Sequence, residues 1–218
     1  MSLTGDKICG VCGRSVSTIG ALYYEAEMRD NNYLCGECMK RCSPNLSLKA
    51  VRGWTRDDAL AHMEYMQNLQ TWLQHSFRCS ATVQGIPGSN DPVLLAADDS
   101  CGMWYSPIAP DAFSFDHVVS WRLSLSYNPD GGFHQVNITP PRPDMPVPGK
   151  TEEVDGMSII VTLKNHPYAE EVEIPILGTK SFLETYKSYL NGGYQIAEAC
   201  YRFFEDRCIK ATGKIEFY

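Results

Sequence analysis

The sequence reads Ile8-Cys9-Gly10-Val11-Cys12-Gly13 and, after a spacer, Tyr33-Leu34-Cys35-Gly36-Glu37-Cys38-Met39-Lys40. Each stretch holds one C-x-x-C pair, and 22 residues separate the two pairs. Zn²⁺ favours four soft or borderline ligands at the corners of a tetrahedron, and both sulfurs of a C-x-x-C pair can reach one ion. The spacing therefore predicts one zinc ion held by Cys9, Cys12, Cys35 and Cys38.

Two other interpretations of the cysteine pairs stay open, namely a redox dithiol and a pair of disulfides. A redox C-x-x-C normally opens a helix within a βαβ pattern, which neither pair shows. Disulfides belong to exported proteins, whereas residues 1–10 lack the basic start and apolar stretch of a secretory signal. The nine cysteines are also an odd number. We therefore expect reduced thiols and a cytoplasmic protein.

The predicted zinc is structural. A catalytic zinc keeps one position open for water and commonly has three protein ligands, whereas four cysteines close the coordination shell. No histidine precedes His62. Cys42 stands four residues after Cys38, so on a helix it would share the same face. It is expected to be a buried bystander, with a spare or exchanging ligand as the alternative.

The residues between the pairs predict a hairpin. Residues 21–28 have strand-like content, 29–32 have turn chemistry, and 33–34 lead back to Cys35. Residues 37–42 then read as one helical turn, ended by Ser43-Pro44. The order knuckle, hairpin, helix predicts a treble-clef-like finger over 1–50, with a plain zinc ribbon as the alternative. Such a small module needs the metal for most of its folding energy.

A connecting helix is predicted within residues 51–76. Thr55 is the expected N-cap, and Asp57 and Asp58 complement the helix dipole in the first turn. Apolar residues follow at three- and four-residue steps, which is typical of a helix that packs one face on a core and runs to about His75. They are Leu60, Met63, Met66, Leu69 and Leu73.

Residues 77–218 predict an antiparallel β domain with C-terminal helices. Strands are expected at 77–84, 93–97, 102–105, 121–127, 157–163 and 170–177. Pro107 and Pro110 indicate a loop, and Pro175 indicates an edge strand. Residues 128–156 are predicted to form one long Pro-rich loop, whose P-x-x-P spacing could also serve as a recognition segment.

The C-terminal helices complete the predicted fold. Ser181 and Glu184 form a capping box, and Asn191-Gly192-Gly193 is expected to interrupt the helix before it continues over 194–210. The whole chain is therefore predicted to be of the α+β class, with a zinc finger, a connecting helix and an antiparallel sheet packed by C-terminal helices.

Composition limits the possible functions. The 218 residues are 44% apolar and 21% charged, with 19 Lys+Arg against 26 Asp+Glu, so the chain is globular rather than disordered. Residues 1–52 carry seven basic and five acidic side chains, an excess that four thiolates and one Zn²⁺ would cancel. This charge disfavours binding to nucleic acid and to anionic membranes. No apolar run approaches the roughly 20 residues of a membrane-spanning helix.

The two cysteine motifs, together with Asn165-His166-Pro167-Tyr168, resemble those of an uncharacterised bacterial family. That family begins with a C-x-x-C…C-x-x-C zinc finger and continues into a helix and a β-rich domain. The resemblance implies a zinc site but no activity, because the family is a domain of unknown function. Some such β domains are similar to the pleckstrin-homology fold, which implies a bent sheet capped by a C-terminal helix.

No catalytic motif is visible. The sequence contains no G-x-S-x-G, H-E-x-x-H or nucleotide-binding glycine motif, and its five histidines lie far apart. The leading hypothesis is a non-catalytic binding or adaptor protein with a protein or peptide partner; its oligomeric state stays open. One alternative is an enzyme whose site assembles only in space. The other is a nucleic-acid binder that uses Arg14, Lys40, Arg41, Lys49 and Arg52.

Overall fold

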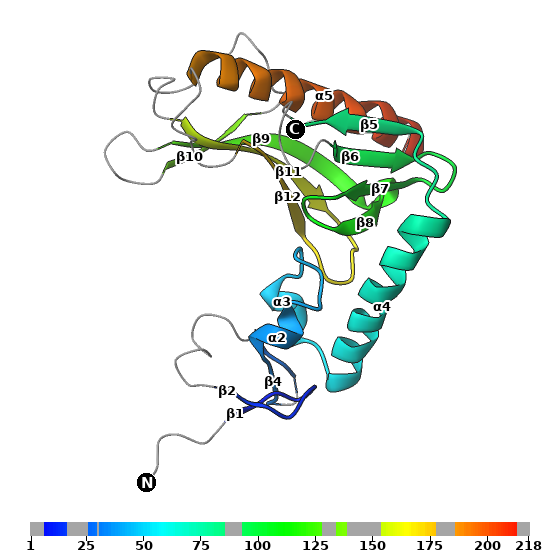
Figure 1. Ribbon diagram of the computed structural model, residues 1–218, viewed down its shortest axis with the longest axis vertical. Helices are drawn as coiled ribbons and strands as arrows, with labels where there is room; N and C mark the ends of the chain where they lie inside the picture. The colour runs from blue at the N-terminus through cyan, green and yellow to red at the C-terminus, as the bar shows by residue number, and fades with distance from the viewer. Residues whose placement is uncertain are drawn as a thin grey trace. The chain divides into compact units, whose positions relative to one another are not determined.

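The computed structural model describes residues 7–16, 26–29, 31–85, 93–127, 134–138, 154–177 and 186–212. Helices and antiparallel sheets are combined in it, which confirms the predicted α+β class (Figure 1). The chain divides into two compact units. Unit 1 comprises Met1–Phe77 and His166–Ala169, and unit 2 comprises Arg78–Asn165 and Glu170–Tyr218. No helix in the described ranges has the length and apolar character needed to cross a membrane.

Unit 1 begins with two short hairpins and continues into helices. The antiparallel hairpins are β1 (Lys7–Ile8) with β2 (Ser15–Val16), and β3 (Ala26–Glu27) with β4 (Tyr33–Leu34). The helices are α2 (Gly36–Met39), α3 (Leu48–Arg52) and α4 (Arg56–His75). The order knuckle, hairpin, helix is the one expected for a treble-clef-like finger.

Helix α4 begins as the sequence predicts. The Thr55 side chain accepts a hydrogen bond from the Asp58 N–H, and Asp58 Oδ2 accepts one from the Thr55 N–H at 2.8 Å. This reciprocal capping box satisfies two backbone donors that would otherwise have no partner. The helix ends at His75, as expected. The prediction of the buried face of this helix is wrong at one residue, because Leu60 is exposed while His62 is buried.

The core of unit 1 surrounds the cysteines. Met28, Leu34, Val51, Ala59 and Met63 are all buried against them. Segment 166–169 of the same unit adds an aromatic contact, since the Tyr168 ring lies 4.4 Å from the His62 ring, centroid to centroid. The Ser47 N–H donates to the Tyr168 carbonyl at 2.9 Å.

The described residues of unit 2 form two four-stranded antiparallel sheets rather than the one predicted. The first has the order β5-β6-β7-β8, formed by Ala81–Gln84, Val93–Asp98, Met103–Ser106 and Asp111–Ser114. The second has the order β10-β9-β11-β12, formed by His134–Ile138, Val118–Tyr127, Val154–Leu163 and Glu171–Leu177. The single turn of η1 (Phe115–His117) leads into β9. Pro175 lies in β12 at the edge of its sheet, as expected.

In the second sheet, side chains alternate between the two faces of each strand, and apolar side chains form the buried face. Leu123, Ile159 and Ile174 are neighbours across β9, β11 and β12, and each is fully buried. Helix α5 (Tyr186–Thr212) packs its Phe204 ring 5.2 Å from Trp104 of β7 and 5.7 Å from Trp121 of β9. One helical side chain therefore joins strands of both sheets in a common core.

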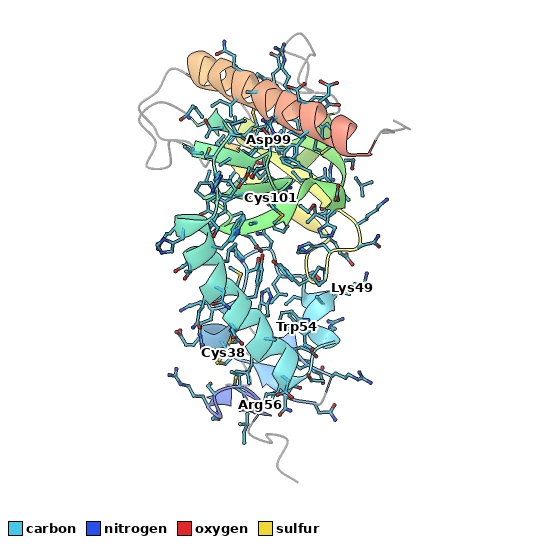
Figure 2. The ribbon with its side chains drawn as sticks, turned by 90° about the vertical axis from the view of Figure 1, so that its right-hand side faces the viewer. Cys38, Lys49, Trp54, Arg56, Asp99 and Cys101 are labelled. Carbon is cyan, nitrogen blue, oxygen red and sulfur yellow. The ribbon has the colours of Figure 1, made fainter. Side chains whose placement is uncertain are left out.

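Polar contacts hold the turn between β6 and β7 in place. Asp99 and Cys101 of this turn are labelled in Figure 2. Asp98 accepts hydrogen bonds from the Arg78 N–H at 2.7 Å and from the Ser100 N–H at 3.0 Å. Arg207 of α5 donates to Asp99 at 2.9 Å across 108 positions of sequence. These bonds tie the start of β5 and the end of α5 to the same turn.

Two predictions about unit 2 are wrong, and one strand was not predicted. Residues 134–138 of the expected long loop form β10, because their pairing with β9 satisfies backbone groups that the sequence alone could not assign. Residues 111–114, for which the sequence predicted no element, form β8. The predicted strand over 77–84 begins only at Ala81, since Phe77 packs against Trp72 with ring centroids 5.4 Å apart.

The predicted interruption of the C-terminal helix is also wrong. Helix α5 runs through Asn191, Gly192 and Gly193 without a break. Each glycine costs a helix up to about 1 kcal/mol relative to alanine, and the buried side chains of Ala197, Cys200 and their neighbours offset that cost. The predicted capping box at 181–184 and the prolines of 140–148 lie outside the described residues.

Candidate metal centre

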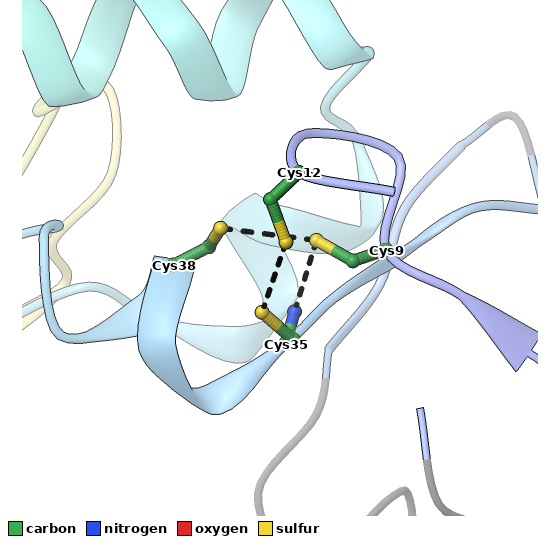
Figure 3. A group of neighbouring side chains, drawn as sticks. All are labelled: Cys9, Cys12, Cys35 and Cys38. Carbon is green, nitrogen blue, oxygen red and sulfur yellow. Dashed lines mark hydrogen bonds between the residues drawn. The ribbon is translucent and has the colours of Figure 1, made fainter. Parts of the chain in front are cut away.

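The four predicted ligands come together in unit 1 (Figure 3). Cys9 Sγ lies 3.8 Å from Cys38 Sγ, and Cys12 Sγ lies 3.7 Å from Cys35 Sγ. All four sulfurs lie within 4.8 Å of one another, so they could hold one metal ion. All nine cysteines are free thiols, and sulfur separations near 3.8 Å are far longer than the ~2.05 Å of a disulfide.

The first C-x-x-C is shaped by backbone hydrogen bonds between β1 and β2. The Cys9 N–H donates to the Arg14 carbonyl, and the Gly13 N–H donates to the Cys9 carbonyl, both at 2.9 Å. Gly13 adopts φ +72°, a conformation that side-chain-bearing residues rarely take. The loop therefore closes tightly enough to direct both of its sulfurs to one point.

Gly10 allows this loop to lie against the second hairpin. Its N–H donates to the Tyr33 carbonyl at 3.0 Å. A Cβ atom at position 10 would stand 2.8 Å from Asn32 Cβ and 3.0 Å from Met28 Cε. The close approach that brings Cys9 next to the second pair is thus open only to glycine.

The second C-x-x-C lies at the junction of β4 and α2. Cys35 is the N-cap residue of α2, and its carbonyl accepts from the Met39 N–H at 2.9 Å. Its own N–H points at Cys9 Sγ, 3.5 Å away. Cys38 lies within the helix, so the helical turn brings its sulfur to the same side as that of Cys35.

The electrostatics of the cluster favour a cation. Burial raises the pKa of the Cys9 thiol, but N–H groups of Cys12, Cys35 and Val11 outweigh burial and lower that pKa to about 7. Burial, followed by the neighbouring sulfurs, raises the pKa of Cys38. The Cys9 sulfur is thus stabilised as a thiolate, whereas the Cys38 sulfur beside it is stabilised as a thiol. A central cation would allow both to ionise, because its positive charge stabilises all four thiolates together.

Cys42 stays outside the group of four. It is buried, and its thiol donates to the Cys38 carbonyl at 3.5 Å. Burial raises the pKa of Cys42 to about 11, which keeps its sulfur protonated near neutral pH. The structure thus places this residue beside the cluster as a buried thiol.

His62 is a buried polar residue of unit 1 whose position the sequence pattern did not predict. Its Nε2 accepts a hydrogen bond from the Ser43 N–H at 3.1 Å. Burial lowers the pKa of His62 to about 4, so the imidazole is neutral, as an acceptor nitrogen requires. The sequence does offer one signal for the burial of His62, because it lies three residues after the buried Ala59 and so on the same face of α4.

Other residues considered for function are not members of the cysteine cluster. Lys40 pairs with Glu37 at 2.8 Å on the surface of α2. Cys79 and Cys101 are exposed in unit 2, whereas Cys200 is buried there. Within the described parts of the chain, the four cysteines are the one group of three or more Cys, His, Asp or Glu side chains close enough to share a metal ion.

Comparison with known proteins adds no relative. No family model matches the chain, and neither do the curated proteins or the solved structures.

Proposed function

We propose that this protein is a non-catalytic binding or adaptor protein in which Cys9, Cys12, Cys35 and Cys38 hold one structural zinc ion. The geometry of the four sulfurs supports this proposal above all else. Sulfurs at tetrahedral corners, about 2.3 Å from a central ion, lie about 3.8 Å apart. The two closest sulfur pairs of the cluster are separated by 3.7 and 3.8 Å.

A closed shell supports a structural role for the zinc. Four thiolates occupy all four tetrahedral positions, and the sulfurs of Cys9, Cys35 and Cys38 belong to buried residues. Neither water nor a substrate has a coordination position from which to react. The ion then acts by stabilising the finger, whose hairpins have only two residues in each strand.

Exposed apolar side chains support the binding role. Ile8 of β1 and Leu48 of α3 are 55% and 58% exposed, although both belong to the small, metal-centred unit 1. Burying each of them against a protein or peptide would gain roughly 1 kcal/mol or more. Reduced thiols in this unit fit a cytoplasmic location, as part of the same proposal.

Metal analysis tests the zinc centre. Purified protein should contain one zinc per chain, and Cys12→Ser and Cys38→Ser should each hold less, while Cys42→Ser should retain the full equivalent. Amide NMR signals of unit 1 should collapse in the first two variants, while those of unit 2 remain. One full equivalent of zinc in both ligand variants would contradict the assignment. Iron in place of zinc would keep the site and change the metal.

Affinity capture tests the binding role separately. An Ile8→Ser/Leu48→Ser variant should keep its zinc and lose a protein that the wild-type chain captures reproducibly. Retention of that protein by the variant would remove these side chains from the interface. A complex with DNA or RNA that weakens steeply with salt would instead favour the nucleic-acid alternative.

A further inference from the structure

The four cluster sulfurs are not equally protected. Cys9, Cys35 and Cys38 are 1%, 7% and 3% exposed, whereas Cys12, in the loop between β1 and β2, is exposed. Oxidation of a thiolate by a dissolved oxidant depends on access to the sulfur. An oxidant that reaches the cluster from solvent therefore meets the sulfur of Cys12 first.

The buried Cys35 lies next to the exposed Cys12. Cys35 Sγ lies 3.7 Å from Cys12 Sγ, and Cys9 Sγ pairs with Cys38 Sγ at 3.8 Å (Figure 3). A disulfide between Cys12 and Cys35 needs its sulfurs to approach to about 2.05 Å. The Cys12 side chain belongs to a short exposed loop, so most of that movement can occur there.

On this basis, and resting on the proposed zinc centre, we infer that Cys12 and Cys35 form a peroxide-sensitive switch that ejects the metal. The Cys12 thiolate attacks one oxygen of hydrogen peroxide, which gives Cys12 sulfenic acid and a hydroxide ion. The Cys35 thiolate then displaces hydroxide from that sulfur and forms the disulfide. Two thiolates lose two electrons in all, and one peroxide is reduced to two hydroxide ions, which take up protons to become water.

Metal release follows from the loss of ligands. The disulfide leaves only Cys9 and Cys38 as thiolates, and two sulfurs do not hold zinc in a closed shell. Because the metal supplies much of the folding energy of so small a unit, its release should unfold the finger. Unit 1 would thus lose its binding surface under oxidative conditions, and a dithiol reductant with added zinc would restore it.

The experiment uses zinc-loaded full-length protein with Cys79→Ser and Cys101→Ser, which removes the exposed thiols of unit 2. Hydrogen peroxide is added, zinc release is followed with a chromogenic chelator, and the disulfide is mapped by alkylation and mass spectrometry. The expected result is one zinc released per peroxide consumed, with Cys12 joined to Cys35. A first-formed Cys9–Cys38 bond, or zinc release without any disulfide, would overturn the inference.

A matched pair of histidine variants locates the point of attack. Cys12→His and Cys9→His each keep four zinc ligands and remove one thiolate, exposed in the first case and buried in the second. We expect Cys12→His to release zinc at least about tenfold more slowly than its parent, and Cys9→His to release it as fast as its parent. Equal protection in both variants, or in neither, would contradict attack at Cys12.

The outcomes also separate this inference from the proposed function. If the parent protein purifies without metal, the zinc centre itself is wrong. If it carries zinc but is oxidised first at another cysteine, only the switch is wrong. If a histidine variant does not bind zinc, the disulfide map of the parent protein decides, since it needs no ligand substitution.

Discussion

At Gly10 the first loop of the finger lies directly against the second hairpin. Because its missing side chain lets the first loop lie on Asn32 and Met28, we expect Gly10→Ala to destabilise the zinc-bound finger by about 1–3 kcal/mol. Gly36 occupies the same place in the second C-x-x-C, but an added Cβ there would meet nothing within 4 Å, so Gly36→Ala is the control. Competition with a chelator measures both. Equal zinc affinity in the two variants would contradict the close approach at Gly10.

The buried His62 should make the stability of unit 1 depend on pH. Burial holds the pKa of folded His62 at about 4, below its ordinary value of 6.5. Between these values the unfolded chain binds the proton and the folded chain does not, so stability falls as the pH drops from 6.5 towards 4. The loss should reach about 1 kcal/mol at pH 5.5. NMR of the imidazole should show His62 neutral down to pH 5, and an ordinary midpoint near its unfolded value would contradict the buried environment.

Helix α5 contains a glycine whose replacement should stabilise the helix. Gly192 lies inside the helix with nothing within 4 Å of an added Cβ, so Gly192→Ala should stabilise unit 2 by about 0.5–1 kcal/mol. Gly102 has the same free space but φ +68°, so Gly102→Ala should destabilise the unit by about 1 kcal/mol. Urea unfolding measures both. Opposite signs are expected, and destabilisation by Gly192→Ala would contradict the helical conformation and free space at Gly192.

The elements differ in how far the sequence could predict them. Helix α4 follows from local signals, since the Thr55 cap, the acidic first turn and the His75 end all act within one segment. Strand β10 pairs with β9, the strand directly before it along the chain, so the prediction of one loop over 128–156 missed a local hairpin. The unbroken α5 depends on distant partners, because the aromatic core around Phe204 outweighs its glycines. The contacts of α5 with Trp104 and Trp121 leave no local pattern in its sequence.

The candidate metal centre was predictable for a different reason. Two C-x-x-C pairs specify their own chemistry, because sulfurs at that spacing suit one ion wherever the hairpins go. The sequence could not show that Cys12 is the exposed one of the four ligands, since burial depends on how β3, β4 and α2 pack against the first loop. Nor could it show that segment 166–169 joins unit 1, some 90 positions beyond Phe77.

In the molecule as a whole, we propose that four sulfurs close around one zinc ion and make unit 1 a metal-stabilised module. X-ray absorption at the zinc edge of the purified, full-length protein tests this most directly. We expect one zinc per chain with four sulfur neighbours at about 2.3 Å and no nitrogen or oxygen in the shell. A spectrum with a water or imidazole ligand, or protein that binds no metal while folded, would contradict it.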